Sequence, residues 1–379
     1  MLEHIVRLAV VVGMLAQVGV PTIRSGPASP RGVPDADSEA RETASNFEVQ
    51  KLAEGVYAVI RKDLPGLMVD ANNVFIIDAD GVVVVDANGS PRITKQVVAA
   101  LSRLTGKPVR YVINTHWHDD HIRGNKVYRE AFPGVRFIGH STMRGYLSGQ
   151  GAVNRKNFLE QAPKFLNHLR GLLTSGKSLS GAPLTDEERA SYASDIRLAD
   201  LVLSEGAESE TVLPDIAVED AMTLFRGRPI EIRRLGKGHT AADLVVHLPE
   251  ERILITGDLV VSPIPLVGDP QSHIKEWAAT LEKLRALRPA IVVPGHGPVM
   301  RDDVYLRLLQ DLFSSITTQT LAAVARGETL QQARESVNLD EFRRRFAGES
   351  AVLRTAFNMY ASGPAVAVAF REAGGQGQP

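Results

Sequence analysis

The sequence predicts a layered α/β fold, and three observations lead to this class. Short runs of β-branched residues, punctuated by Gly, Asn and Asp, recur from Phe47 onward and are typical of strands and hairpins. Segments with helical periodicity alternate with these runs. Several of the runs also end on histidine or aspartate, which places polar side chains at one edge of the predicted sheets.

The first half of the chain contains most of these runs. The predicted strands are EGVYAVIR (54–61), NNVFIIDADG (72–81), GVVVVDANG (81–89), PVRYVINT (108–115) and VRFIGH (135–140). Two helices are predicted between them, PRITKQVVAALSRLTG (91–106), which has a terminal glycine, and GNKVYREAFP (124–133), which a proline ends. This alternation of strand and helix favours the α/β class.

The middle of the chain differs, because residues from about 141 to 210 have the pattern of amphipathic helices joined by a loose Ser- and Gly-rich segment. We predict a helical insertion there. Strand patterns then return at 221–236, 243–261 and 290–297. We therefore expect one α/β domain over 47–301 that contains the insertion, and a C-terminal helical extension over 302–379.

The N-terminal segment is typical of a secretory signal. A weakly basic start precedes an apolar run that is too short to span a bilayer comfortably, and small residues follow it. We expect a signal peptide over 1–28 and a linker over 29–46, with export to the periplasm or the medium and no stable membrane span in the mature protein. Glu3 in the charged region and Met14 as another start favour the alternative, an upstream extension on a cytoplasmic protein.

The composition narrows the classes of function. Hydrophobic residues make up 44% of the chain and charged residues 23%, which are ordinary values for a globular protein. The formal net charge is -1, so no nucleic-acid partner is expected. The sequence contains no cysteine, which excludes disulfides, a thiol nucleophile and thiolate metal ligands. We expect a small-molecule substrate and, if a metal is present, nitrogen and oxygen ligands.

The stretch INTHWHDDHIRGN (113–125) crowds three histidines into six positions. Similar polar residues stand just beyond other predicted strands, at the edge where α/β sheets bind ligands; together they are His116, His118, His239, Asp258 and His296. His116 and His118 are two apart on extended chain and project to the same side, whereas Asp120 and His121 start the next helix. One turn can therefore supply two metal positions, and imidazole with carboxylate suits Zn, Mn or Fe.

This pattern resembles the metallo-β-lactamase-fold hydrolases. Their His-x-His-x-Asp-His motif is matched at positions 116–121, and their later histidine, bridging aspartate and final histidine are matched by His239, Asp258 and His296. The resemblance covers roughly residues 47–302. It implies a four-layer αβ/βα sandwich built from two similar halves, here with a helical insertion and C-terminal helices.

The resemblance also implies a role for each matched residue. It assigns a first metal to His116, His118 and His239, a second metal to Asp120, His121 and His296, and the bridging position to Asp258. An aspartate rather than a cysteine among the ligands is similar to the glyoxalase II and lactonase branches of the family.

The activity that the resemblance implies is hydrolysis with two zinc ions, with iron or manganese as other candidates. A hydroxide shared by two metals about 3.5–4 Å apart would attack an ester, thioester, lactone or β-lactam carbonyl. Asp120 would be the catalytic residue that orients the nucleophile or carries its proton. By analogy the insertion covers the metal edge, and an apolar lid there favours a substrate with a hydrophobic tail.

Two alternatives stay open. A mononuclear iron dioxygenase of the persulfide-oxidising kind needs only two histidines and one aspartate, and the complete second set of ligands argues mildly against it. A phosphodiesterase or nuclease is the third hypothesis, and the near-neutral charge weighs against it.

Four residues near the motif each have two interpretations. Arg123, where the family usually has a glycine, either binds a substrate carboxylate or is an internally paired or solvated helix residue, which we favour. His140 ends a predicted strand and is a weaker candidate for substrate contact. We expect Asp119 to cap the following helix. Asp86 is either a hydrogen-bond partner of a ligand histidine or a strand-end turn residue.

Overall fold

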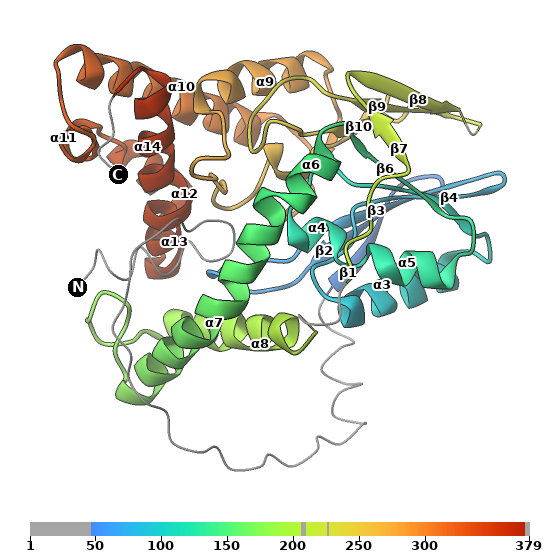
Figure 1. The fold of residues 1–379 in the computed structure, drawn as a ribbon, viewed down its shortest axis with the longest axis horizontal. Coiled ribbons are helices and arrows are strands. Elements are labelled where there is room, and N and C mark those ends of the chain that lie inside the picture. The colour runs from blue at the N-terminus through green and yellow to red at the C-terminus, as the bar shows by residue number, and fades with distance from the viewer. Residues whose placement is uncertain (1–46, 206–209, 226, 376–379) are drawn as a thin grey trace.

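The computed structural model describes residues 47–205, 210–225 and 227–375. Two β-sheets stack face to face, and helices cover the outer face of each sheet (Figure 1). This is a four-layer αβ/βα arrangement with added helices in the middle and at the C-terminal end, so the predicted fold class is confirmed. The predicted signal peptide and linker lie outside the described residues.

The first sheet places the ends of its parallel strands at one edge. In chain order, which is also the spatial order, its strands are β1 (Phe47–Ala53), β2 (Val56–Arg61), β3 (Asn73–Asp78), β4 (Gly81–Val85), β5 (Val109–Ile113), β6 (Arg136–His140) and β7 (Ile216–Val218). The strands from β1 to β4 pair antiparallel, and those from β4 to β7 pair in parallel. The chain therefore leaves β4 and β5 on the same side, where Asp86 and the histidine motif follow.

The second sheet delivers residues to the same edge. Its spatial order is β12 (Ile291–Val293), β11 (Ile253–Ile255), β10 (Val245–Leu248), β9 (Pro229–Arg233) and β8 (Ala221–Phe225). Only the β11–β12 pair is parallel among these described strands, and Leu254 lies opposite Val292. Asp258 and His296 follow β11 and β12, so the parallel pair brings them together.

Apolar side chains from both sheets form the central layer of the core. Alternate residues such as Val74 and Ile76 from β3 meet Ile232 from β9 and Val246 from β10, and all four are at most 1% exposed. This alternation follows from the period of two in a β-strand. The packing fixes the two sheets relative to each other and hence the two groups of loops that follow them.

Helices form the outer layers. They are α3 (Pro91–Leu104) and α5 (Asn125–Ala131) on the first sheet, and α9 (Ile274–Ala286), α10 (Val304–Ala325) and α14 (Gly363–Glu372) on the second. The beginning of α3 is explained by its sequence. Ser90 accepts a hydrogen bond from the backbone N–H of Ile93 at 3.2 Å, and Pro91 occupies the first turn, where a missing N–H costs nothing.

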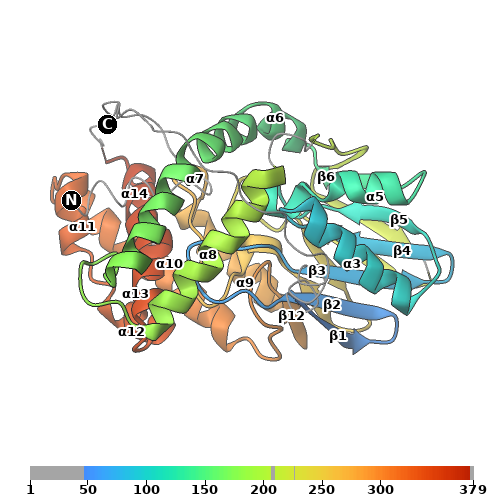
Figure 2. The ribbon, with the colours of Figure 1, turned by 90° about the horizontal axis from the view of Figure 1, so that it is seen from below.

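The predicted insertion forms the helices α6 (Met143–Ser148), α7 (Gln150–Ser175) and α8 (Asp186–Glu205). Figure 2 shows α7 and α8 side by side next to the first sheet. Phe165 on α7 and Leu198 on α8 pack into the same apolar cluster as the outer face of that sheet. Asp195 on α8 accepts hydrogen bonds from the backbone N–H groups of Leu67 and Met68, each at 2.9 Å. The insertion is therefore tied to the loop before β3.

The C-terminal helices contact both halves of the sandwich. Besides α10 and α14 they are α11 (Leu330–Ser336), α12 (Asp340–Ala347), α13 (Ala351–Ala356) and the π-helix η3 (Phe357–Ser362). The Tyr360 hydroxyl donates to the carbonyl of Leu67 in the first half at 2.6 Å. The Tyr360 carbonyl accepts from the N–H of Val267 in the second half at 2.8 Å. One residue thus joins the two halves.

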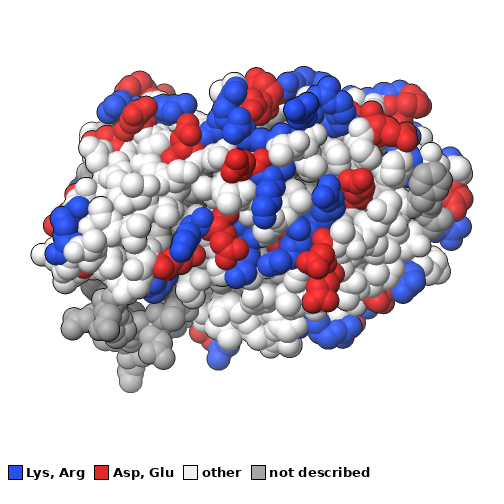
Figure 3. Space-filling view, turned by 90° about the horizontal axis from the view of Figure 1, so that it is seen from above, with Lys and Arg blue, Asp and Glu red and all other residues white. Residues whose placement is uncertain are grey.

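The surface shows charges of both signs. On the face seen in Figure 3, Lys and Arg are interspersed with Asp and Glu, and uncharged areas separate the groups. Among the residues that the structure describes, no helix has both the length and the apolar character needed to cross a bilayer.

Candidate metal centre

The structure brings the seven predicted ligand residues to the shared edge of the two sheets. His116 and His118 follow β5, Asp120 and His121 lie on the short helix α4 (Asp119–Ile122), His239 lies between β9 and β10, Asp258 lies in the 3₁₀-turn η2 (Gly257–Leu259), and His296 follows β12. Their potential ligand atoms form three overlapping groups in which all atoms lie within 4.8 Å of one another. Residues up to 180 positions apart in the sequence therefore converge on one small volume.

Two of these groups correspond to the two predicted metal positions. In the first, His239 Nε2 lies 2.9 Å from His118 Nδ1, and His116 completes the group. In the second, His296 Nε2 lies 3.2 Å from Asp120 Oδ2 and 3.3 Å from His121 Nε2. Each group contains three potential ligand atoms. A divalent cation commonly takes three ligands from protein, and solvent or substrate completes its coordination shell.

Asp258 lies between the two groups. Its Oδ1 is 3.2 Å from His121 Nε2 and 3.3 Å from His296 Nε2. Its Oδ2 is 3.5 Å from His239 Nε2 and 4.0 Å from His116 Nε2. One oxygen thus faces each group, as a bridging carboxylate requires.

Hydrogen bonds behind the histidines fix which ring nitrogen faces inward. His239 Nδ1 lies 2.8 Å from the Leu266 carbonyl, and His296 Nδ1 lies 3.0 Å from the Asp70 carbonyl. A carbonyl only accepts, so both Nδ1 atoms carry hydrogen, and each ring in its neutral form presents a bare Nε2 to the centre. The opposite arrangement holds for His118, whose Nε2 lies 3.0 Å from Gln271 Oε1 and whose Nδ1 faces the first group.

The donor set fits cations on physical grounds. His121 Nδ1 lies 2.9 Å from Asp86 Oδ2, so its Nε2 is also a bare acceptor when the ring is neutral. Two such acceptors, His121 Nε2 and His296 Nε2, face each other at 3.3 Å, and they repel unless a proton or a cation lies between them. The buried His116 Nε2 and Asp258 Oδ1 have no hydrogen-bond donor among the described residues. Buried acceptors in this arrangement are what a cation would satisfy.

The electrostatics of the two groups differ. Burial lowers the pKa of His118, and it lowers the pKa of His239 to about 4, which keeps these rings neutral and able to bind a cation. Burial also opposes charge on His296, but the carboxylates of Asp258 and Asp120 outweigh it and raise the pKa of His296 to about 10. The second group therefore attracts positive charge strongly.

Asp86 supports the centre from behind. Its carboxylate accepts hydrogen bonds from the Thr115 N–H and hydroxyl, both at 2.8 Å, and from His121 Nδ1. To do so it adopts a left-handed backbone with φ of 59°, which few non-glycine residues occupy. Of its two interpretations, the hydrogen-bond partner of a histidine in the predicted ligand set is the one that this contact favours.

The prediction for Asp119 is wrong. The helix α4 begins at Asp119 itself, His118 occupies the cap position, and no side chain caps the first turn. The Asp119 carboxylate instead forms an ion pair with Arg155 of α7, with Arg155 Nε 2.9 Å from Asp119 Oδ2. The reason is tertiary: a bidentate partner from the insertion competes for the carboxylate that would otherwise cap the helix.

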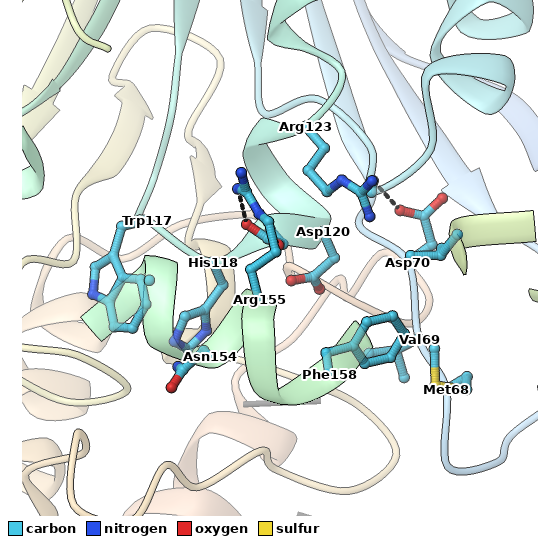
Figure 4. A pocket seen from close by; sticks show the side chains of 14 residues that line it. Met68, Val69, Asp70, Trp117, His118, Asp120, Arg123, Asn154, Arg155 and Phe158 are labelled. Atoms are coloured by element: carbon cyan, nitrogen blue, oxygen red, sulfur yellow. Dashed lines mark hydrogen bonds and ion pairs between the residues drawn. The ribbon is translucent and has the colours of Figure 1, made fainter. Parts of the chain in front are cut away.

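A cavity opens beside the centre, and Figure 4 shows the side chains that line it. His118 and Asp120 line it, and Arg123 also lines it with its guanidinium directed toward Asp70. Burial lowers the pKa of Arg123, while the nearby carboxylates, first of all that of Asp119, act in the opposite direction. The other predicted contact, His140, is not among the lining residues, and its Nδ1 lies 2.8 Å from the Thr142 hydroxyl.

By analogy the insertion was expected to cover the metal edge, but sequence reasoning named none of the residues with which it lines the cavity. From α7 come Gly151, Asn154, Arg155 and Phe158, whose spacing of three, four and seven residues defines one face of a helix. The periodicity predicted a helix with an inner face. It gave no means of distinguishing a face that packs into the core from one that lines a cavity.

Comparison with known proteins identifies the family. Residues 67–296 match the family model described as the metallo-beta-lactamase superfamily, which is more than half of the chain and contains all seven residues of the centre. The chain belongs to the metallo-beta-lactamase superfamily. The predicted resemblance is thereby confirmed, and the prediction of a metal-dependent hydrolase agrees with this membership.

Relatives within the superfamily are distant. A linear primary-alkylsulfatase from Pseudomonas sp. (strain ATCC 19151) is 26% identical over 65% of this chain and 46% of its own length. A metallo-beta-lactamase type 2 from Bacteroides fragilis is 35% identical, but over only 22% of this chain and 36% of its own length. The chain spans about half the length of the curated relatives that it matches.

A solved structure supports the fold. The metallo-beta-lactamase from Pontibacter korlensis superposes with a TM-score of 0.50 and 20% identity, over 71% of this chain and 99% of that protein. At this identity the likeness concerns the fold alone.

Proposed function

We propose that the protein is a hydrolase that uses two divalent cations, most simply zinc. His116, His118 and His239 would hold the first cation, Asp120, His121 and His296 the second, and Asp258 would bridge them. The observation that carries this proposal is the placement of the two Asp258 oxygens, one toward each group of donors. Iron and manganese accept the same ligand types, so the proposal treats zinc as the first candidate.

The two bound cations would lower the pKa of a shared water toward 7 and polarise the bond under attack. The chain's own part is positioning. Asp120 lines the cavity, and its Oδ2 lies 3.2 Å from His296 Nε2 and 3.5 Å from His121 Nε2. From this position its carboxylate would orient the attacking water by accepting a hydrogen bond from it.

The bond that is cleaved would be an ester, thioester, lactone or β-lactam carbonyl. A second candidate is a sulfate ester, because the relative that matches 65% of this chain is a linear primary-alkylsulfatase. All these substrates need the same attacking group, so a panel of substrates separates them better than any feature of the metal ligands.

The test is elemental analysis of protein that has never met a chelator, followed by hydrolysis assays. We expect about two zinc ions per chain and hydrolysis of at least one member of a panel containing nitrocefin, lactoylglutathione, acyl-lactones, p-nitrophenyl esters and alkyl sulfates. The variant His118→Ala should bind less zinc, and its kcat/KM should fall by roughly 1,000-fold or more, because one metal position is destroyed.

A matched control is His168→Ala, which removes an exposed histidine from α7. It should keep both zinc and rate. One iron per chain with oxygen uptake would instead support the dioxygenase alternative, and full activity of His118→Ala would contradict the proposed centre.

Export remains a prediction from the sequence, as do the boundaries at residues 28, 46 and 301. Sequencing the N-terminus of protein recovered from its native cells tests the first of these. A start near residue 29 in the exported fraction is expected.

A further inference from the structure

The cavity beside the metal centre has two chemically different ends. In Figure 4, His118 and Asn154 lie at one end, Phe158, Val69 and Met68 lie together at the other, and Asp120 lies between them. Val202 of α8 also lines the cavity. Pockets for small molecules usually combine an apolar wall with a few polar groups that orient the ligand, and this cavity has that character.

The apolar end is held in place by the core behind it. Phe158 packs with one side on the apolar cluster under the insertion, yet it stays partly exposed, as do Val69 and Val202. All three residues line the cavity. A ligand that covered their exposed surface would be stabilised by the burial of apolar area of the protein and of the ligand itself.

The arginines of the cavity are engaged with protein carboxylates. Arg155 donates from Nε and Nη2 to the Asp119 carboxylate and from Nη1 to the Thr211 hydroxyl at 2.7 Å. Arg123 is directed toward Asp70. Arg155 therefore ties α7 to the helix that carries Asp120. Because both arginines are paired with carboxylates, neither presents an unbalanced charge to the apolar end.

From this geometry we infer that the protein acts on esters of an apolar chain, which lies against Phe158, Val69, Met68 and Val202 while the cleaved bond lies at His118 and Asp120. This inference rests on the proposed function for the bond that is broken, and it adds the class of substrate. It also assigns Phe158, a residue of the insertion, as a determinant of specificity.

The spacing on α7 sets a minimum length for the chain. Asn154 beside the reacting end and Phe158 at the apolar end are four residues apart, which is about 6 Å along a helix axis. An acetyl group is too short to cover that distance, whereas a hexanoyl or octanoyl chain reaches Phe158. Selectivity should therefore appear between these lengths.

The experiment measures kcat/KM for p-nitrophenyl acetate, butyrate, hexanoate and octanoate, and for butyl to decyl sulfates, below their micelle concentrations. In the unaltered protein, each methylene buried at the apolar end should raise kcat/KM by up to about fourfold, the value that follows from the free energy of burying one methylene. Phe158→Ala should reduce the octanoate-to-acetate ratio of kcat/KM at least tenfold. Phe158→Leu should fall between the two.

A second variant fills the cavity instead of enlarging it. Val202→Phe should slow the long-chain substrates selectively. Val153→Ala is the matched control for Phe158→Ala. Val153 lies on α7, as Phe158 does, but it is 51% exposed to solvent, and its loss should leave the octanoate-to-acetate ratio unchanged. A ratio that Phe158→Ala and Val202→Phe both leave unaltered overturns the inference.

Binding without hydrolysis separates this inference from the proposed function. Alkane sulfonates of two, six and ten carbons cannot be hydrolysed, and calorimetry should show affinity that rises with chain length in the unaltered protein and rises less in Phe158→Ala. If zinc or hydrolysis is absent but this trend appears, the proposed function fails and the apolar site stands. If hydrolysis depends on His118 but neither rate nor affinity responds to chain length, the reverse holds.

Discussion

At the scale of single residues, Asp86 connects the two groups of donors. It holds His121 directly, and it holds Thr115, whose hydroxyl lies 3.1 Å from His116 Nδ1. Its left-handed backbone is destabilising for a non-glycine residue and persists because these contacts over-determine it. A single carboxylate at the end of β4 thus orients one histidine in each group.

We predict that Asp86→Asn weakens zinc binding by about 10–100-fold, the usual effect of removing a hydrogen-bond partner of a metal ligand. One asparagine oxygen cannot accept from the Thr115 N–H, the Thr115 hydroxyl and His121 Nδ1 together, because in Asp86 these donors use both oxygens. Competition with a chromophoric chelator measures the affinity. Asp311→Asn, which alters an exposed carboxylate on α10, should bind zinc as the unaltered protein does; equal affinities in all three proteins would refute the role of Asp86.

The strand-end pattern by itself indicated five polar residues at the edge where α/β sheets bind ligands. The assignment of all seven residues as metal ligands came from the family resemblance and stays a prediction. The contact between Asp119 and Arg155 could not be predicted in this way. It joins residues 36 positions apart, and the local pattern at Asp119 indicates a helix cap equally well.

At the scale of elements, α8 holds the loop that forms part of the cavity wall. Asp195 accepts from the N–H groups of Leu67 and Met68, and a Cβ added to Gly66 would lie 2.3 Å from Asp195 Oδ1. Only a glycine fits there. The helical periodicity of the insertion predicted α7 and α8, but their attachment to this loop depends on a buried carboxylate whose partner lies 127 residues away.

Asp195 makes the stability of this attachment dependent on pH. Burial raises the pKa of Asp195 to about 7, although the backbone N–H groups of Met68 and Leu67 act against the shift. An unfolded aspartate titrates near 3.9, so between about pH 4 and pH 7 the folded chain retains a proton that the unfolded chain has released. The contribution of Asp195 to the free energy of unfolding therefore falls as pH rises through this range.

The variant Asp195→Asn keeps an oxygen for both N–H groups and removes the titration. We predict that the stability of this variant, compared with that of the unaltered protein at the same pH, is greater at pH 8 than at pH 4.5. Urea denaturation at the two pH values measures the difference. Ser204→Ala, an exposed change on the same helix, should differ from the unaltered protein by the same free energy of unfolding at both pH values. If Asp195→Asn also showed no change with pH, the titration of Asp195 would be excluded.

At the scale of the whole molecule, the C-terminal helices share a core with the second sheet. Trp277 of α9 stacks on Phe313 of α10 with ring centroids 4.4 Å apart, and both belong to a cluster that includes Leu254 of β11 and Val366 of α14. The family resemblance predicted the sandwich and its two halves. The sequence patterns also suggested an extension that begins near residue 302, but they could not show that this extension continues the core, because its partners lie in distant strands.

We predict that a chain ending after Arg301 does not fold to a stable state. Loss of the C-terminal helices would remove Leu309, Phe313 and Val366, which are each at most 3% exposed. The apolar surface of the second sheet and α9 that these residues now cover would become exposed to water. Size-exclusion chromatography and thermal unfolding should show aggregation or the absence of a cooperative transition, beside a full chain that unfolds cooperatively. A soluble truncated monomer with a sharp transition would mean that the extension is an independent unit.

Tyr360 has a consequence for how ligands come and go. Its hydroxyl and its carbonyl join the two halves at one place, which opposes separation of the halves there. We therefore expect substrate and product to enter and leave where the insertion borders the cavity. If release of product limits turnover, the rate should respond to solvent viscosity and to changes in α7, and hardly at all to changes deep between the sheets.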